Sequence, residues 1–250
     1  MNIKTVLYKG WKVYFPDKYT ENIELGKCVV DNNFEVENII KDTERNYVAL
    51  VIINNKKYIL KEIRAEINLI QRKVQTFLKK GEALTTLTNY YLLDDSIKPE
   101  VARPYVVVIK KSIFIKKSYI LLEYIDGVKI QNNNDIDKVV SVIKNIHKLK
   151  RYHGDLNTSN FLKKKDGEVV TFDTQLKKEI FSNFKRSYDI LNMKEDLLVI
   201  ELGYDLNKKY KIEKKIGYII AYLIKRIKKM KVISKFRELK RERRIKRWKI

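Results

Sequence analysis

The polarity pattern of residues 34–63 predicts β-strands. The segments FEVENIIK (34–41), YVALVII (47–53) and KYILKEI (57–63) are rich in Val, Ile and Tyr, which favour strands. The polar segments DTERN and NNKK separate them, and both compositions are typical of turns. We therefore expect three consecutive antiparallel strands in this region.

Residues 64–93 change to a helical period, because apolar residues recur every three to four positions, and Gly81 is a candidate break. These apolar residues are Ile67, Ile70, Val74, Phe77, Leu78, Leu84, Leu87 and Tyr91. Residues 101–125 return to strand composition and predict a strand pair joined by a KKS-type turn.

The chain after Asp126-Gly127, a predicted turn and domain boundary, reads mostly as helix. Residues 135–149 predict a helix with Asp135 as its N-cap, and residues 161–174 predict a short hairpin. Everything beyond about residue 176 reads as helix. An apolar stripe there is expected to pack in the core: Ile212, Ile216, Ile219, Ile220, Leu223 and Ile227.

This order predicts an α+β protein with two lobes. Residues 1–125 form a β-rich N-lobe with a helix, and residues 126–250 form a mostly helical C-lobe. With 44% apolar and 34% charged residues, the 250-residue chain is expected to fold around a substantial core.

Cys28 is the only cysteine, which excludes an internal disulfide and a cysteine-based zinc site and fits a reducing compartment. The apolar runs are too short to span a bilayer, and the first 19 residues hold no signal-peptide core. We therefore expect a cytoplasmic protein without a transmembrane segment.

The formal net charge is +23, and it is concentrated at the C-terminal end. Residues 208–250 hold 19 Lys or Arg against three acids, and residues 234–250 hold nine against two. Such a surface favours polyanions. Its apolar residues, Trp248 among them, suit a lipid interface, so we expect the basic end to bind an anionic membrane surface; a solvated basic end is the alternative.

Three polar side chains carry the candidate chemistry. Asp155 and Asn160 lie in the loop after the predicted helix, and Asp173 follows a strand whose hairpin returns it beside Asn160. A carboxylate and a carboxamide form an oxygen-only site that suits Mg²⁺. A second carboxylate held off the metal can accept the proton of an alcohol. This combination favours phosphoryl transfer from ATP to a hydroxyl.

HGDLNTSN (153–160) followed by FDT (172–174) resembles the catalytic loop and metal loop of the protein-kinase-like fold. YILKE (58–62) resembles the strand that carries the ATP lysine in that fold. Over roughly residues 1–200 the order of elements is similar to that of bacterial lipopolysaccharide core heptose kinases. The resemblance implies a bilobal kinase-like fold and an ATP-dependent kinase that acts on a sugar hydroxyl.

The resemblance also implies roles for individual residues. Asp155 would be the base or would orient the hydroxyl, and Asn160 with Asp173 would hold Mg²⁺. Lys61 would contact the α- and β-phosphates of ATP, with Glu82 as its preferred carboxylate partner and Glu66 as the alternative.

Further roles follow from the same resemblance. The segment from Glu123 to Ile125 would be the linker whose backbone meets adenine, and His153 would support the loop. Asp189 or Asp196 would anchor the catalytic loop from a later helix, and the sequence does not choose between them.

The sequence departs from the protein-kinase pattern at three places. The turn DTERN lacks the glycines that cover phosphates, Asp173-Thr174-Gln175 replaces Asp-Phe-Gly, and His-Gly-Asp replaces His-Arg-Asp. Protein kinases use the missing arginine to sense a phosphorylated activation loop. Its absence therefore favours a constitutive kinase of small molecules or glycans.

The preferred hypothesis is a kinase of the lipopolysaccharide inner core, with a core intermediate as the acceptor. Since that acceptor is built on the cytoplasmic face of the inner membrane, the membrane that the basic C-terminal end is expected to bind would be the anionic inner face of the inner membrane. The alternatives are a RIO-type protein kinase whose basic end binds ribosomal RNA and a non-catalytic kinase-fold binding module. An aminoglycoside phosphotransferase is disfavoured because cationic antibiotics require an acidic pocket. Nucleic acid is the less favoured partner.

Overall fold

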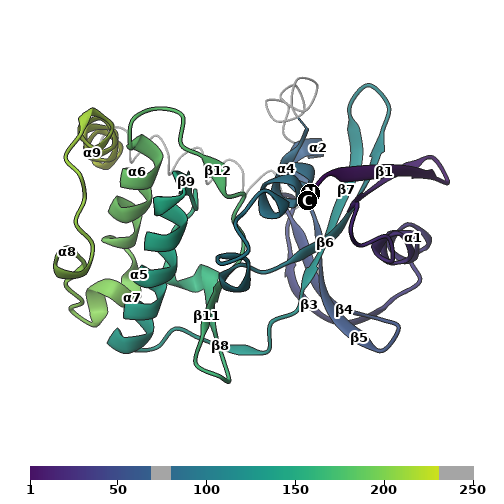
Figure 1. The fold of residues 1–250 in the computed structure, drawn as a ribbon, viewed down its shortest axis with the longest axis horizontal. Helices are drawn as coiled ribbons and strands as arrows, with labels where there is room; N and C mark the ends of the chain where they lie inside the picture. The colour runs from purple at the N-terminus through teal and green to yellow at the C-terminus, as the bar shows by residue number, and fades with distance from the viewer. Residues whose placement is uncertain (69–79, 231–250) are drawn as a thin grey trace. The chain divides into compact units, whose positions relative to one another are not determined.

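The structure, a computed structural model, describes residues 1–68 and 80–230 (Figure 1). It divides into two compact units. Residues 1–130 and 159–176 form the first unit, and residues 131–158 with the chain from Lys177 on form the second. A large antiparallel sheet dominates the N-terminal part and helices follow it, so the protein is α+β as predicted. The lobe boundary predicted at residue 125 stays a prediction.

The first unit is built on a seven-stranded sheet in the order β1-β2-β6-β7-β5-β4-β3, with antiparallel neighbours throughout. Its strands are β1 (Ile3–Tyr8), β2 (Trp11–Pro16), β3 (Glu35–Asp42), β4 (Tyr47–Ile53), β5 (Lys56–Glu62), β6 (Pro104–Lys111) and β7 (Ile115–Glu123). The predicted three-strand meander is β3-β4-β5, and the predicted strand pair is β6-β7.

Two tight turns fix the registers of hairpins in this sheet. Asn54 and Asn55 join β4 to β5 with φ of 49° and 60°, and Lys9 and Gly10 join β1 to β2 with φ of 46° and 76°. Two positive φ values in a two-residue turn match the right-handed twist of the strands. The Asn-Asn pair therefore explains why β5 begins where it does.

Helix α1 (Asn22–Asp31) covers one face of the sheet. It packs closely through Gly26, where a Cβ atom would lie 2.4 Å from Cγ1 of Val13. The buried side chains beneath it include Val13, Ala49 and Val51. We predict no element over residues 1–33 from the sequence pattern, so β1, β2 and α1 are seen only in the structure.

The first unit also contains short helices and three short strands outside the large sheet. They are α2 (Ala65–Asn68), α4 (Glu82–Tyr91), η1 (Lys98–Glu100), β8 (Gly127–Lys129), β10 (Phe161–Lys164) and β11 (Val169–Thr171). The break expected at Gly81 is confirmed, since α4 begins directly after it. Residues 161–174 form the predicted hairpin. Ile70, Val74, Phe77 and Leu78 lie outside the described residues.

The second unit is mainly helical, with a short strand pair. It contains α5 (Asn133–Lys148), β9 (Arg151–Tyr152), β12 (Lys177–Lys178), α6 (Phe184–Met193), α7 (Leu197–Glu201), α8 (Leu206–Lys209) and α9 (Ile216–Lys229). The one-turn helix η2 (Thr158–Asn160) spans the change from the second unit to the first.

The predicted N-cap of α5 is wrong by three residues. Asn132 is the N-cap, and its side chain accepts the backbone N–H of Asp135 at 3.0 Å. The carboxylate of Asp135 in turn accepts the backbone N–H of Gln131 at 3.2 Å. The first bond satisfies one of the N–H groups that a helix start leaves open, and the second holds the residue before the N-cap, so Asn132 and Asp135 both contribute to the helix start.

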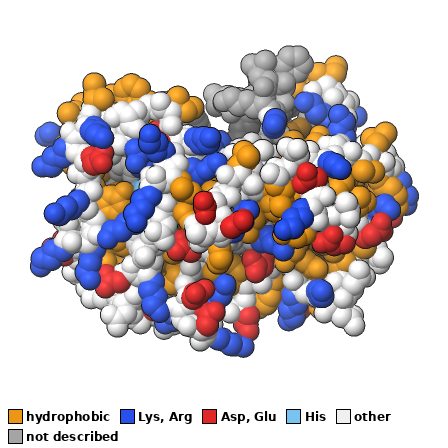
Figure 2. All heavy atoms as spheres, viewed as in Figure 1, with side chains coloured by type: hydrophobic (Ala, Val, Ile, Leu, Met, Phe, Trp, Pro, Cys, Tyr) orange, Lys and Arg blue, Asp and Glu red, His pale blue; other side chains and the backbone are white. Residues whose placement is uncertain are grey.

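The apolar stripe predicted as core is also corrected. Ile216, Ile219, Leu223 and Ile227 are each about half exposed or more, and Figure 2 shows hydrophobic side chains at the surface over α9. The helix packs instead through Gly217 and Ala221, since a Cβ atom at Gly217 would lie 2.5 Å from the backbone nitrogen of Phe184. Small residues permit this close approach to α6, which turns the larger residues outward.

No helix among residues 1–68 and 80–230 is both long and apolar enough to cross a membrane. The basic segment 234–250, which carries the predicted membrane contact, lies outside the described residues.

Candidate functional site

Lys61 is the centre of a charged cluster in the first unit. It lies on β5 between Val48 of β4 and Ile120 of β7, and only 12% of its side chain is exposed. Its Nζ lies 3.6 Å from Oε1 of Glu82 and donates a hydrogen bond to Oδ1 of Asp173. The structure thus brings a strand lysine, a helix glutamate and a strand-end aspartate together.

The two carboxylates keep the Lys61 ammonium charged. Burial by itself lowers the pKa of Lys61, because it disfavours the charged form. The charges of Asp173 and Glu82, and their hydrogen bonds, more than offset this effect, so that the pKa of Lys61 is raised above its ordinary value. At neutral pH the side chain is therefore a largely buried cation able to attract phosphate.

Glu82 is positioned by the start of α4. Gly81, with φ of 81°, lets the chain pass close to Glu66, whose carboxylate accepts the backbone N–H of Glu82 at 2.6 Å. A Cβ atom at residue 81 would lie 3.1 Å from Glu66 Oε2. Glu66 is buried and serves the helix start, whereas Glu82 forms the ion pair with Lys61.

The β10-β11 hairpin brings Asn160 close to Thr171 and Phe172, which directly precede Asp173. The carbonyl of Asn160 accepts the backbone N–H of Phe172 at 3.0 Å and the hydroxyl of Thr171 at 3.3 Å. Asp173 then follows with φ of 55°, a left-handed conformation that is uncommon outside glycine. Asn160 is buried and Asp173 is exposed.

Glu123 and Ile125 lie at the end of β7. Glu123 exchanges two hydrogen bonds with Arg103: its N–H donates to the Arg103 carbonyl at 2.8 Å, and its carboxylate accepts the Arg103 N–H at 3.1 Å. Ile125 is buried in a small apolar cluster with Ala102 and Val170. This segment is therefore tied to both β6 and the hairpin of the first unit.

The oxygen donors of Asn160 and Asp173 fit a hard divalent cation. Mg²⁺ is commonly held by one or two carboxylates together with substrate phosphates and water, so two protein donors are enough for a site of this kind. Within the described ranges, no group of three or more His, Cys, Asp or Glu residues forms an all-protein metal cage.

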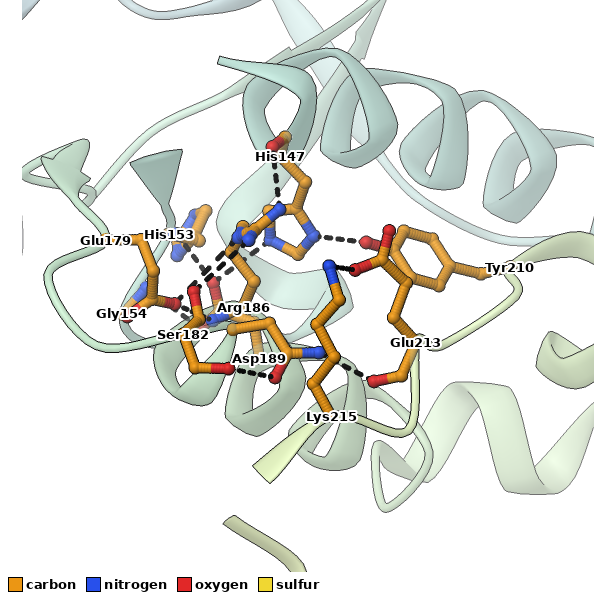
Figure 3. Close-up of polar contacts among 11 residues, drawn as sticks. His147, His153, Gly154, Glu179, Ser182, Arg186, Asp189, Tyr210, Glu213 and Lys215 are labelled. Atoms are coloured by element: carbon orange, nitrogen blue, oxygen red, sulfur yellow. Dashed lines mark hydrogen bonds and ion pairs between the residues drawn. The ribbon is translucent and has the colours of Figure 1, made fainter. Parts of the chain in front are cut away.

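The loop that carries Asp155 belongs to the second unit and is held by a buried carboxylate. Asp189 of α6 accepts the backbone N–H of His153 at 2.6 Å and that of Gly154 at 3.0 Å (Figure 3). Gly154 has φ of 94°, which strongly favours glycine there. Asp155 itself is exposed, and its N–H reaches Nδ1 of the buried His153 at 3.4 Å. The buried His153 side chain thus supports the loop backbone at Asp155.

The far end of the same loop is held by Asp196. Its carboxylate accepts the backbone N–H and the hydroxyl of Thr158, both at 2.9 Å, and it also caps the first turn of α7. Both candidate anchors therefore contact the loop, one at each end. Sequence reasoning missed this shared function because it treated Asp189 and Asp196 as alternatives.

Comparisons with known proteins reveal one distant relationship. No protein-family model matches the chain. The lipopolysaccharide core heptose(II) kinase WaaY of Escherichia coli is similar to it, with 21% identity over 184 residues, which cover 66% of this chain and 74% of that kinase. This similarity supports a distant relationship to a kinase.

Proposed function

We propose that this chain is an ATP-dependent kinase that transfers the γ-phosphate to a sugar hydroxyl, and that its acceptor is a heptose of the lipopolysaccharide inner core. The observation that carries the proposal is the contact of Lys61 with both Glu82 and Asp173. A buried cation between a helix glutamate and a metal-type aspartate is the arrangement that phosphate binding requires. The distant similarity to a heptose kinase supports the acceptor class.

The first unit would bind the nucleotide. Lys61 would contact the α- and β-phosphates, with Glu82 fixing its direction, and the backbone from Glu123 to Ile125 would meet adenine. Asn160 and Asp173 are the residues that would hold Mg²⁺. When bound, this ion neutralises phosphate charge, which water alone does poorly near a half-buried site.

The second unit would supply the acid–base group. Asp155 is exposed at the tip of a loop whose backbone is anchored at His153, Gly154 and Thr158. Its carboxylate would accept the proton of the acceptor hydroxyl as that oxygen bonds to the γ-phosphorus and ADP leaves. The anchoring bonds run through the backbone and through Asp189 and Asp196, so they would fix the loop while the Asp155 carboxylate meets the acceptor.

Mass spectrometry tests this proposal directly. Lipopolysaccharide is isolated from cells with and without the gene, and from cells with the gene carrying Asp155→Asn. We expect one phosphate group to be absent from the core in both deficient samples. Identical core masses in all three would reject the heptose acceptor, and ADP release from ATP by the purified protein with other acceptors would then test the kinase activity separately.

A further inference from the structure

The second unit contains a basic hollow with a volume of about 670 Å³. Eight of its eleven lining residues are Lys or Arg, and Glu213 is the one carboxylate among the described residues that line it. They come from the end of α5, the start of α6 and the segment from 208 to 215. Figure 2 shows Lys and Arg side chains spread over these elements.

Half of the eight cations form no ion pair with the described part of the chain, whereas Arg186, Lys208 and Lys209 lie 3.9, 3.6 and 3.0 Å from Glu179, Asp205 and Asp137. Glu213 pairs with Lys215 at 2.7 Å, which cancels the negative charge of the lining. Lys144, Lys148 and Lys211 are exposed and form no ion pair with the described part of the chain. Cations that converge from separate segments repel each other, so an anionic ligand would offset this electrostatic repulsion.

The floor of the hollow is polar and rigid. His147 is 3% exposed, and its Nδ1 lies 2.6 Å from the hydroxyl of Tyr210 (Figure 3). Arg186 donates to the backbone carbonyl of His147 at 3.2 Å. Burial raises the pKa of Tyr210 to about 12, so its hydroxyl keeps its proton at neutral pH. These contacts hold the end of α5, the start of α6 and the segment around Tyr210 together.

Two buried nitrogen atoms of the floor have no hydrogen-bond partner, Nε2 of His147 and Nε of Arg186. Their nearest carboxylates are Asp189, 3.5 Å from the His147 nitrogen, and Glu179, 3.9 Å from the Arg186 nitrogen. Buried polar atoms are usually satisfied, and atoms left open often mark a binding site. These two nitrogens face carboxylates of the same unit, so the lysines around the rim are the groups that a ligand in the hollow would meet.

We propose that this hollow is a second binding site, which takes a ligand with several phosphate groups. Lysine ammonium groups act as point charges for phosphate, and the arginine fork adds directional donors. One monovalent anion would leave most of the charge uncompensated, which favours a multiply charged ligand. The proposal is independent of the kinase function, because neither the nucleotide site nor Asp155 contributes to the hollow.

Calorimetry with inositol hexakisphosphate, a soluble polyphosphate, tests the site in the full chain. The variant Lys144→Gln, Lys148→Gln, Lys211→Gln removes three exposed charges and leaves the buried floor intact. We expect it to bind at least about tenfold more weakly, since each exposed pair contributes a fraction of a kcal/mol and several act together. Replacing the same three lysines by Arg should keep the affinity, and thermal unfolding checks that all variants fold.

Two matched controls separate the hollow from general positive charge. One carries Gln at Lys4, Lys12 and Lys116, which are exposed on the sheet of the first unit. The other carries Gln at Lys240, Lys246 and Lys249 of the basic C-terminal segment. Both lose the same charge as the test variant, and we expect both to bind the probe like the unaltered protein.

Sedimentation with vesicles of phosphatidylcholine and phosphatidylglycerol distinguishes the source of the phosphate. Weaker binding of the soluble probe alone supports a free phosphorylated ligand, and weaker binding of both probes supports a lipid headgroup. With the soluble probe, equal binding by the test variant, or an equal loss in either control, overturns the site. A loss seen only with a short single-stranded RNA overturns it too, in favour of a nucleic-acid surface.

Discussion

The candidate catalytic residues of the two units are held in place by different kinds of contact. In the first unit, Lys61, Glu82 and Asp173 hold one another, since their own charged groups form the contacts. In the second unit, the loop around Asp155 is held mainly through its backbone, by the buried carboxylate of Asp189 and the half-buried carboxylate of Asp196. The Asp155 carboxylate takes no part in these anchoring bonds.

This difference separates binding from stability. Side chains that pair with one another can exchange those partners for phosphate or metal, so their loss should affect ligand affinity first. Backbone groups held by a buried carboxylate have no replacement partner, so loss of the carboxylate should affect folding first. The four predictions below test this contrast, from the largest expected effect to the smallest.

Asp189→Ala should lower the free energy of unfolding by about 3 kcal/mol or more, because the backbone N–H groups of His153 and Gly154 both lose their acceptor and each such bond to a charged group is worth about 1.5–3 kcal/mol. Urea denaturation measures this. Asp95→Ala is the control, since the Asp95 side chain is 93% exposed and its ion pair with Lys98 should contribute little. Equal stability of the two variants would contradict the anchoring role.

Asp155→Asn should lower turnover about a hundredfold or more, the scale of a lost general base and about 2.7 kcal/mol. Its stability should change by no more than about 0.5 kcal/mol because the residue is exposed. Steady-state kinetics with ATP and acceptor, together with urea denaturation, measure both quantities. ATP affinity should be preserved; near-normal turnover would remove Asp155 from the mechanism.

Asp173→Ala should abolish the effect of Mg²⁺ on ATP binding, a loss of at least about tenfold or 1.4 kcal/mol. Calorimetry of ATP with and without Mg²⁺ measures it. Asp126→Ala is the matched control, because Asp126 is an exposed aspartate that pairs with Lys165. If Mg²⁺ strengthens ATP binding equally in both variants, another residue holds the metal.

Gly81→Ala should cost about 1 kcal/mol more than Gly10→Ala. Both glycines have positive φ, so both substitutions strain the backbone by similar amounts. Only at Gly81 does the added Cβ meet Glu66 and Ile115, whereas nothing lies within 4 Å at Gly10. Thermal or urea unfolding of the pair isolates the contact, and equal losses would mean that Glu66 moves freely aside.

The strands and hairpins were predictable because their signals are local. Alternation of Val, Ile and Tyr defined β4 and β5, and the Asn-Asn turn between them needs no distant partner. The hairpin that returns Asp173 toward Asn160 followed from the same logic. The break at Gly81 was also visible, since few residues other than glycine tolerate that backbone.

The sequence by itself determined the α+β order of elements and the spacing of Asp155, Asn160 and Asp173, because both depend on periodicity and on short separations. Only the tertiary structure decided that Glu82 pairs with Lys61, that Asp189 and Asp196 both anchor the loop, and that α9 packs through its smallest residues. These outcomes depend on contacts between residues far apart in the chain. Such contacts are fixed by packing geometry, for which local composition holds no signal.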